Sequence, residues 1–252
     1  MFKWRSRQPS PPEIEVSPEP APVASPDFPE DSLLGVQMRI MNRQAALRIV
    51  DAGAQHGQTA QEYLEAFPNC HVIALEPEGA NHAAAAAALA GYGDRVALLR
   101  AGLSDIAGEA DLRMTSHSGA HSLLEVGDMR YYDEPVDVLL PERIKVTTID
   151  LLCAQHGIGV LDILKMDIQG GELLALKGAE VMLSRGAIRL IALEVLFQPL
   201  YQKQPSFWDL ADYLRAHDYA FHGLYEAQHH AKNPAVLRWA DAIFVAPHMT
   251  AL

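Results

Sequence analysis

Apolar residues in this chain alternate between short runs rich in Val, Ile and Leu and longer segments with helical spacing. A short apolar run bounded by turn residues predicts a strand, and apolar residues three and four apart predict a helix. Strands are predicted at 49–51, 71–77, 96–103, 110–115, 143–149, 161–167, 188–195, 219–225 and 240–246. Helices are predicted at 33–41, 58–67, 79–90, 151–156, 172–184 and 207–217.

This order of elements predicts an α/β fold. Strands that alternate with helices form a mostly parallel, doubly wound sheet. The last two predicted strands, 219–225 and 240–246, have no helix between them, which indicates a hairpin-like pair and an antiparallel last strand. Ligands of such sheets bind at the carboxyl ends of the strands.

Length and composition divide the chain into two unequal parts. With 252 residues, of which 49% are hydrophobic, it can bury one sizeable core. Residues 31–252 are therefore predicted to form one domain. Residues 1–30 are crowded with Pro, Glu, Ser and Ala, and a segment of that composition buries too little surface to offset the entropy of ordering. They are predicted to be a disordered leader.

The most informative short stretch runs from Arg48 to Thr59. Two β-branched residues lead into Asp51, and Gly53 and Gly57 then open a turn before the next predicted helix. A strand, a tight loop and a helix in this order aim backbone N–H groups and a helix N-terminus at one point, which suits a carboxylate or phosphate. Glycine admits positive φ and lets a ligand lie against the backbone.

Spacing and a second acid narrow the choice of ligand. A dinucleotide site requires G-x-G-x-x-G, whereas Gly53 and Gly57 stand four apart, so NAD(P) is the less favoured ligand. Glu76 ends the second predicted strand, where a carboxylate can accept hydrogen bonds from both hydroxyls of a ribose. An ordinary strand-to-helix turn with a surface acid is the alternative interpretation of either motif alone.

Further acids end the next two buried strands. Period-two alternation places Lys165 and Asp167 on one face of a strand, with Asp167 at its carboxyl end, and Glu194 ends the neighbouring strand. Adjacent strands lie roughly 4.8 Å apart. The Asp167 and Glu194 carboxylates are therefore predicted to converge on one substrate hydroxyl or one cation.

The charge and the hydropathy of the chain exclude several classes of partner. A formal net charge of -12 and a pI near 5.3 argue against nucleic acid, because phosphate backbones are bound by clustered Lys and Arg. No run of 18 or more apolar residues and no apolar signal segment occur. The chain is therefore expected to be cytoplasmic, with no transmembrane segment.

The cysteines and paired histidines suggest no metal site. Cys70 and Cys153 form no C-x-x-C pair and are expected to be free. His117 and His121 are four apart, but the glycine between them disfavours a helical metal pair, and they are expected in a loop that meets substrate. The histidines at 229–230 are expected in a polar connection before the last strand.

Taken together, these motifs resemble the FkbM family of S-adenosylmethionine-dependent methyltransferases. The resemblance covers roughly residues 46–226. It is carried by Ile49-Val-Asp51-Ala-Gly53-Ala-Gln-His-Gly57, Ala74-Leu-Glu76-Pro77, Leu103-Ser104-Asp105, Val146-Thr-Thr-Ile-Asp150, Leu164-Lys165-Met-Asp167-Ile-Gln-Gly170-Gly-Glu172, Leu176-Lys177-Gly178-Ala179 and Leu193-Glu194-Val195. The Lys-x-Asp-x-x-Gly-x-Glu block is the most specific part. Gly171 stands where the family more often has Ala.

The resemblance implies a Rossmann-like class I methyltransferase fold and S-adenosylmethionine as cofactor. The cofactor-binding residues that it implies are Asp51 for the amino group, Gly53, Ala54, Gln55 and Gly57 for the methionine carboxylate, Glu76 for the ribose, and Ser104 and Asp105 near the adenine. The reaction that it implies is O-methylation of a hydroxyl on a sugar, glycan or other secondary metabolite.

The same resemblance implies roles for the acids at the third and fourth strand ends. Asp167 is the expected base, Glu194 its helper, and Lys165 a third candidate catalytic residue. For Lys165 and Glu172, a buried charge cluster that fixes strand to helix is an equally good interpretation. A divalent cation is compatible with the two carboxylates, because related O-methyltransferases hold one at these strand ends.

Two other functions remain open at this level. One is a binding protein that keeps the methyltransferase fold without turnover, and the other is an NAD(P)-dependent oxidoreductase, which the glycine spacing disfavours. The acceptor is expected to be a small molecule or a glycan, bound between residues 114–141 and 197–207. Its identity and the oligomeric state are beyond what the sequence specifies.

Overall fold

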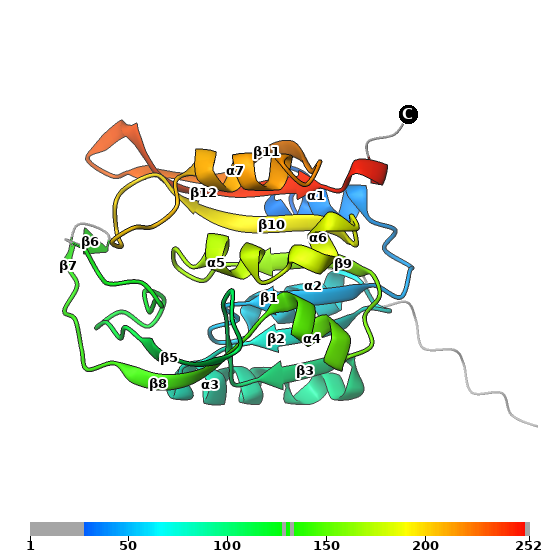
Figure 1. Ribbon diagram of the computed structural model, residues 1–252, viewed down its shortest axis with the longest axis horizontal. Helices are drawn as coiled ribbons and strands as arrows, with labels where there is room; N and C mark the ends of the chain where they lie inside the picture. The colour runs from blue at the N-terminus through cyan, green and yellow to red at the C-terminus, as the bar shows by residue number, and fades with distance from the viewer. Residues whose placement is uncertain (1–27, 128–129, 132–133, 250–252) are drawn as a thin grey trace, which may run out of the picture.

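The structure is a computed structural model that describes residues 28–127, 130–131 and 134–249. Its centre is a seven-stranded sheet in the order β11-β12-β10-β9-β1-β2-β3 (Figure 1). These strands are β1 (Arg48–Ala52), β2 (His71–Leu75), β3 (Val96–Leu99), β9 (Leu161–Met166), β10 (Ile188–Leu196), β11 (Ala220–His230) and β12 (Asn233–Val245). The predicted leader lies almost entirely outside the described residues.

The strand directions confirm the predicted fold class. β1 pairs in parallel with β2 and β9, β2 with β3, and β9 with β10. β12 runs antiparallel to both of its neighbours, β10 and β11. The result is a mostly parallel α/β sheet with an antiparallel last strand. The carboxyl ends of β1, β2, β9 and β10 therefore meet at one edge, where open α/β sheets bind ligands.

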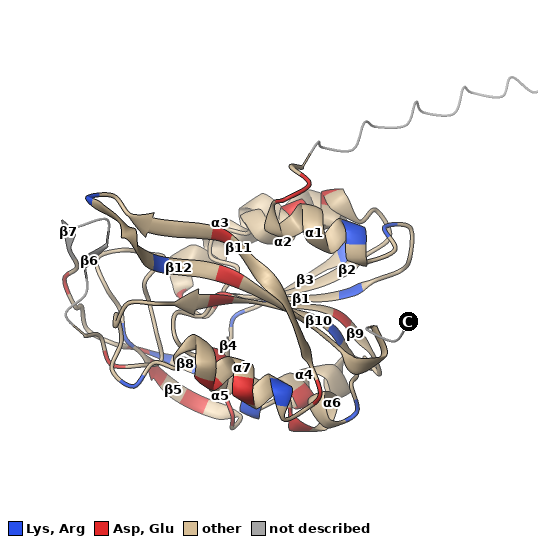
Figure 2. Ribbon diagram, turned by 90° about the horizontal axis from the view of Figure 1, so that it is seen from above, with Lys and Arg blue, Asp and Glu red and all other residues tan. Residues whose placement is uncertain are grey.

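Helices cover both faces of this sheet (Figure 2). One face carries α1 (Leu33–Ile40), α2 (Gln58–Ala66) and α3 (Gly79–Leu89), and the other carries α4 (Ile149–Gln155), α5 (Glu172–Lys177), α6 (Glu180–Ser184) and α7 (Phe207–Arg215). Two short 3₁₀ helices, Ala90–Arg95 and Pro247–Met249, complete the set. No helix in the described ranges has the length and apolar character needed to cross a membrane.

The alternation of side chains along the strands builds the two cores. Ile49 and Ile163 pack with α1, α2 and α3, whereas Val50 and Leu164 pack with α4 to α7. All four are at most 1% exposed, as expected for a parallel sheet buried on both faces. Cys70 and Cys153 are buried and free, which confirms the expectation for them.

The predicted strand at 96–103 is two strands in the structure. β3 ends at Leu99, and after Arg100 and Ala101 the chain enters β4 (Gly102–Leu103) of a second sheet. This sheet has the order β4-β8-β5, with β5 (Gly108–Leu112) and β8 (Glu142–Thr147), and a two-stranded ribbon joins β6 (Arg130–Tyr131) to β7 (Glu134–Pro135). The sequence prediction missed this break, although Arg100 and Gly102 interrupt the apolar run there.

The predicted helix at 172–184 is also interrupted. α5 ends at Lys177, and Gly178 follows it at a point where a Cβ would overlap the backbone carbonyl of Ser104. The carboxylate of Asp150 then accepts hydrogen bonds from the N–H groups of Val181 and Met182, at 2.8 and 3.0 Å, and starts α6.

The chain between residues 219 and 246 forms a hairpin longer than predicted. β11 continues to His230 and β12 begins at Asn233, and the end of this hairpin projects beyond the sheet (Figure 1). His229 pairs in register with Leu237. The prediction that the histidines at 229–230 lie in a loop is therefore wrong, because their partners on β12 extend the ladder.

Candidate functional site

The loop after β1 has the tight geometry that its glycines predicted. Gly53, Gln55 and Gly57 have φ values of 82°, 46° and 87°. The N–H groups of Gly53 and Ala54 both donate to the carbonyl of Leu75, at 3.0 Å, which fastens the loop to the end of β2. Gly57 then begins α2 without a side-chain cap, so the first N–H groups of that helix face outward without an intrahelical partner.

Gly53 is required by the protein's own backbone. A Cβ there would overlap the carbonyl of Asp167, and the left-handed φ costs a residue other than Gly about 1–2 kcal/mol. Gly53→Ala is therefore expected to lower the free energy of unfolding by more than about 2 kcal/mol in urea denaturation. Gly91→Ala is the matched control, because no atom lies within 4 Å of its Cβ position. Equal stability of the two variants would contradict this account.

Glu76 follows β2 with its carboxylate held on both sides. Oε2 accepts from the N–H of Gln55 and Oε1 from the N–H of Glu78, each at 2.9 Å. The side chain is 5% exposed, and this burial raises the pKa of Glu76 to about 7 in spite of the two backbone donors. Each oxygen keeps a second lone pair, so the carboxylate can still accept from a ligand hydroxyl.

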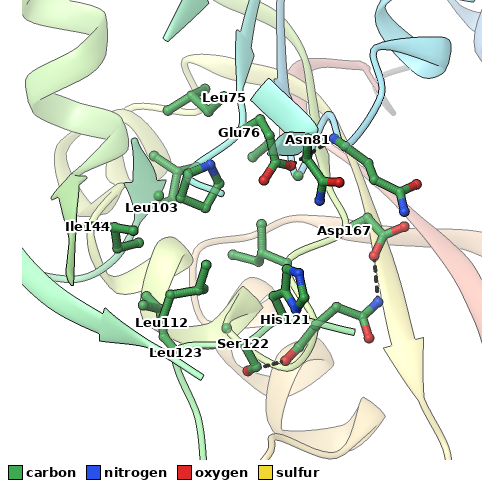
Figure 3. Close-up of a pocket in the computed structure, with 18 of the residues that line it drawn as sticks. Leu75, Glu76, Asn81, Leu103, Leu112, His121, Ser122, Leu123, Ile144 and Asp167 are labelled. Atoms are coloured by element: carbon green, nitrogen blue, oxygen red, sulfur yellow. Dashed lines mark hydrogen bonds between the residues drawn. The ribbon is translucent and has the colours of Figure 1, made fainter. Parts of the chain in front are cut away.

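A pocket opens beside Glu76, between the main sheet and the smaller one (Figure 3). Its wall is apolar and is formed by Leu75, Leu103, Leu112, Leu123 and Ile144. Its polar lining comes from the Glu76, Asn81, His121, Ser122 and Asp167 side chains. One side is thus suited to a flat apolar ring and the other to hydroxyl groups.

The pocket includes residues that the sequence did not identify. Asn81 on α3 is 3% exposed, and its side-chain amide donates to the carbonyl of Ser118 at 3.1 Å. Ser122 comes from the loop at 113–126. His121 was expected in a loop that meets substrate; its side chain lines this pocket beside Glu76 and not the cleft that contains Glu194 and Trp239. Burial lowers the pKa of the His121 imidazole. Only the folding of the loop at 113–126 over the strand ends brings these side chains together.

Ser104 and Asp105 do not line this pocket. The Ser104 N–H donates to the Thr147 carbonyl at 2.9 Å, and the Ser104 hydroxyl donates to the Asp105 carboxylate at 3.1 Å. Because β3 ends at Leu99, the segment after it lines the pocket with Ala101, Gly102 and Leu103. Ser104 and Asp105 lie past the turn, with Asp105 exposed.

Asp167 and Glu194 lie close together at the ends of β9 and β10, as predicted. They are joined by the side-chain amide of Gln169, whose Nε2 lies 2.9 Å from Asp167 Oδ1 and 2.7 Å from Glu194 Oε2. Burial and the neighbouring Asp167 carboxylate raise the pKa of Glu194 well above its usual range. Within the described ranges, no three His, Cys, Asp or Glu side chains group as a metal ion requires.

Lys165 lies behind the acid pair, in a cluster of buried charges. Its ammonium is 3.7 Å from Asp167 Oδ2 and 3.8 Å from Asp241 Oδ1, and its register partner on β1 is Asp51. Burial disfavours the charge of Lys165, but the three carboxylates outweigh it and raise the pKa of the ammonium. Lys165 is therefore charged and acts as the counterion of three acids.

Asp51 is the least satisfied acid of that cluster. Its side chain is 1% exposed, and Oδ2 has no hydrogen-bond partner among the described residues. Burial raises the pKa of Asp51 to about 7, although Lys165 acts in the opposite direction. A buried carboxylate oxygen without a partner costs free energy, so this position calls for a donor from a ligand or water.

Glu172 has a structural position. It is 2% exposed, and its Oε1 accepts from the N–H of Ile168 at 3.0 Å, which holds the turn directly after Asp167. Burial raises the pKa of Glu172 to about 7. Of the two interpretations of this residue, the geometry supports the one in which it fixes the strand to the helix.

Buried acids with raised pKa values, Glu194 among them, make the stability of the protein depend on pH. Burial raises the pKa of Asp51, Glu76 and Glu172 to about 7 and that of Asp241 to about 6. In the unfolded chain these carboxyl groups lose their protons near pH 4, whereas in the folded protein they keep them up to about pH 7. Because the folded state binds more protons between pH 4 and 7, the stability of the protein falls as the pH rises through that window. His121 has the opposite effect, because its pKa is lowered on folding and it therefore makes stability rise with pH. This effect is confined to pH values below 6.5, the ordinary pKa of the imidazole.

We therefore expect the free energy of unfolding to fall between pH 6.5 and pH 8. Glu76→Gln removes one of these contributions and should make this fall smaller by less than about 1 kcal/mol, because only about half a unit of the window lies below its pKa of about 7, at about 1.4 kcal/mol for each unit. Urea denaturation of both proteins at constant ionic strength measures the difference. A wild-type protein that gains stability over this window, or a Glu76→Gln variant with an unchanged slope, would argue against these shifts.

Comparisons with known proteins identify the family of this chain. The family model described as the methyltransferase FkbM domain matches residues 51–221. The 2-O-methyltransferase NoeI of Sinorhizobium fredii (strain NBRC 101917 / NGR234) is 27% identical over 173 residues, which are 66% of this chain and 70% of NoeI.

A solved structure shows the same fold. The crystal structure of methyltransferase FkbM from Methylobacillus flagellatus KT matches with a TM-score of 0.51 and 22% identity. The match covers 79% of this chain and 43% of that chain, so the present chain corresponds to less than half of that protein's length. Because the family model spans more than half of the present sequence, the chain belongs to the FkbM family of S-adenosylmethionine-dependent methyltransferases.

Proposed function

We propose that this protein transfers the methyl group of S-adenosylmethionine to a hydroxyl of a sugar, glycan or other secondary metabolite. The observation that carries the proposal is the meeting of Asp167 and Glu194 beside the pocket at the ends of β1 and β2. Asp167 lines that pocket and also the cleft that contains Glu194. It therefore stands between the two ligands that such a reaction brings together.

The residues present fit the cofactor. The carboxylate of Glu76 can accept from ribose hydroxyls, and the apolar wall with Leu103 and Ile144 can hold the adenine. The uncapped start of α2 at Gly57 suits the methionine carboxylate. The buried Asp51 Oδ2, which has no partner among the described residues, can accept from the amino group, directly or through water. Ser104 and Asp105 have no part in this proposal.

The acceptor is proposed to bind in the cleft beyond Asp167. This cleft is lined by Gln55, Gly119, Asp167, Gln169, Glu194, Leu196, Leu200 and Trp239. The amide and carboxylate groups of this cleft can bond to the hydroxyls of a hydroxylated ring, and the C–H face of that ring can pack on the indole of Trp239. The excess of carboxylates disfavours a phosphorylated or carboxylated acceptor. The printed name of the relative NoeI, a 2-O-methyltransferase, supports a hydroxyl as the acceptor group.

The chain's own residues supply alignment and a proton acceptor. Bound S-adenosylmethionine supplies a methyl group on a sulfonium, and its transfer requires an in-line approach of the acceptor oxygen. Asp167 accepts the proton of that hydroxyl as general base. Glu194 accepts a hydrogen bond from the same acceptor and so fixes its orientation. Lys165 forms an ion pair with Asp167, its ammonium 3.7 Å from Oδ2, and so helps to hold that carboxylate in place.

A binding experiment tests the cofactor first. The melting temperature of the protein is measured with S-adenosylhomocysteine, NAD+ and NADP+ in turn. Stabilisation by S-adenosylhomocysteine alone is expected, because a ligand that binds only the folded state raises the melting temperature. Stabilisation by a nicotinamide dinucleotide alone would favour an oxidoreductase and refute the proposal.

Turnover then tests the acceptor class. The protein is incubated with S-adenosylmethionine and panels of neutral sugars, glycans and hydroxylated metabolites, and the release of S-adenosylhomocysteine and the mass of the product are recorded. A gain of one methyl group on an acceptor oxygen is expected. Cofactor binding without turnover on any acceptor would support the alternative of a non-catalytic protein with this fold.

A further inference from the structure

The amide of Gln169 occupies the space between the two acids. Its Nε2 donates to Asp167 Oδ1 at 2.9 Å and to Glu194 Oε2 at 2.7 Å, so both of its hydrogens are used on carboxylates (Figure 3 shows the first of these bonds). An NH₂ group is the only part of an amide that can donate to two acceptors. The orientation of the amide is thus determined by its neighbours.

The other end of the same side chain is held as well. The Tyr201 hydroxyl lies 2.9 Å from Gln169 Oε1, and Tyr201 is itself 3% exposed. The Gln169 backbone carbonyl accepts from the Ser122 hydroxyl at 2.7 Å. Gln169 therefore has partners on its amide nitrogen, its amide oxygen and its backbone, contributed by β9, β10 and two loops.

The backbone of Gln169 is strained to reach this position. Its φ is 54°, in the left-handed region that costs a residue with a side chain about 1–2 kcal/mol. Strain of this kind persists only where surrounding contacts outweigh it, and it is concentrated at functional sites. The contacts that outweigh it here are the bonds to the two acids and to Tyr201.

The amide stands where a divalent cation shared by the two acids would have to lie. The nitrogen-to-oxygen distances of 2.9 and 2.7 Å are those of hydrogen bonds. Mg²⁺ requires oxygen ligands at about 2.0–2.1 Å and Ca²⁺ at about 2.3–2.6 Å. A cation can therefore bridge Asp167 and Glu194 only if the amide leaves and the carboxylates move closer together. The residues present do not fit a metal at this position.

We infer that Gln169 is a positioning residue whose amide takes the place of a metal ion, holding Asp167 and Glu194 apart and oriented toward the acceptor. This inference rests on the proposed function for the role of Asp167 and Glu194 in the reaction. The position of the Gln169 amide between them is a property of the protein without ligands. The two amide hydrogens offset the repulsion between the carboxylates, which is the task that a cation performs in a metal-bridged pair. The pair then acts without a metal ion.

Manganese binding tests the inference without an acceptor. Wild-type protein, Gln169→Glu, Gln169→Asn and Gln44→Glu are titrated with MnCl₂ by isothermal calorimetry and electron paramagnetic resonance. Gln169→Glu replaces the donor with a third carboxylate of the same shape, and it is expected to bind one Mn²⁺ at least about tenfold tighter than wild type. Gln44→Glu adds the same charge at an exposed position and should bind as wild type does.

The asparagine variant guards against a folding defect in the glutamate variant. Asn tolerates the left-handed backbone well, but its amide is one methylene too short to reach both acids. It should remain folded and bind Mn²⁺ more tightly than wild type, though less tightly than Gln169→Glu. Wild-type protein that binds Mn²⁺ as tightly as Gln169→Glu, at a site that Glu194→Gln abolishes, would overturn the inference.

Once an acceptor that the protein methylates is known, steady-state kinetics with that acceptor provide the readout for positioning. Gln169→Asn is expected to lower kcat much more than it changes the KM for S-adenosylmethionine, because the Gln169 amide bonds to the two acids that are proposed to act on the acceptor. Wild-type turnover should be the same with and without EDTA. A wild-type protein that loses turnover in EDTA and regains it with Mg²⁺ would refute the inference, whereas absence of methyl transfer would refute only the proposed function.

Discussion

Asp167→Asn is expected to reduce kcat by about 10²- to 10⁴-fold, the range that a positioned general base contributes. The substitution keeps the shape of the side chain and removes its ability to take the hydroxyl proton. The affinity for S-adenosylhomocysteine should stay within about threefold of wild type, because the interaction that is lost is made only during transfer. Single-turnover kinetics and calorimetry measure the two quantities separately.

Two observations decide whether this assignment is correct. Asp94→Asn, an exposed substitution far from the strand ends, serves as the control and should turn over as wild type does. Retained turnover in Asp167→Asn would remove Asp167 from the role of base. A variant that loses cofactor binding together with turnover would instead show that Asp167 holds the cofactor.

Lys165→Met is expected to lower the free energy of unfolding by about 3–5 kcal/mol, because removing one partner of a buried ion cluster leaves the other charges uncompensated. The side chain of Lys165 is 8% exposed and lies 3.7 and 3.8 Å from the carboxylates of Asp167 and Asp241. Methionine has a similar length, so the loss reports charge more than packing. Urea denaturation at pH 7 measures it.

Two further variants separate charge from packing in this prediction. Lys145→Met changes an exposed lysine of β8 and should alter stability by no more than about 0.5 kcal/mol. Adding Asp241→Asn to Lys165→Met removes one of the orphaned charges and should restore part of the lost stability. An unstable Lys145→Met variant, or no recovery in the double variant, would place the cause outside the ion cluster.

Local patterns in the sequence were sufficient to predict the architecture. Short apolar runs such as 72–75, buried on both faces, are typical of a parallel sheet, and the absence of a helix before the last strand left it to pair as a hairpin. Ser32 caps α1, its hydroxyl accepting from the N–H of Gly35 at 3.0 Å, and this residue type directly before an apolar segment is a local signal of a helix start. Such signals act within a few residues and are therefore visible without the fold.

The same holds for the strand-end acids. Asp51, Glu76, Asp167 and Glu194 each lie within two residues of the carboxyl end of a buried strand, and parallel pairing brings such positions to one edge. Their mutual approach could thus be predicted before the structure was known. The exact positions of Ser104 and Asp105 could not, because a long-range pairing with β8 decides where β3 ends.

Contacts between distant segments decided the rest of the site. Gln169 meets Asp167, two residues away, but it also meets Glu194 and Tyr201, 25 and 32 residues further on, and no local pattern encodes those distances. The partners of Lys165 likewise include Asp241, which reaches it only because β12 returns beside β10. The sequence by itself determined which elements form and which acids end the strands, since both follow from short-range periodicity. Which side chain separates those acids was decided by tertiary structure, because hydrogen bonds form only after packing has brought their partners together.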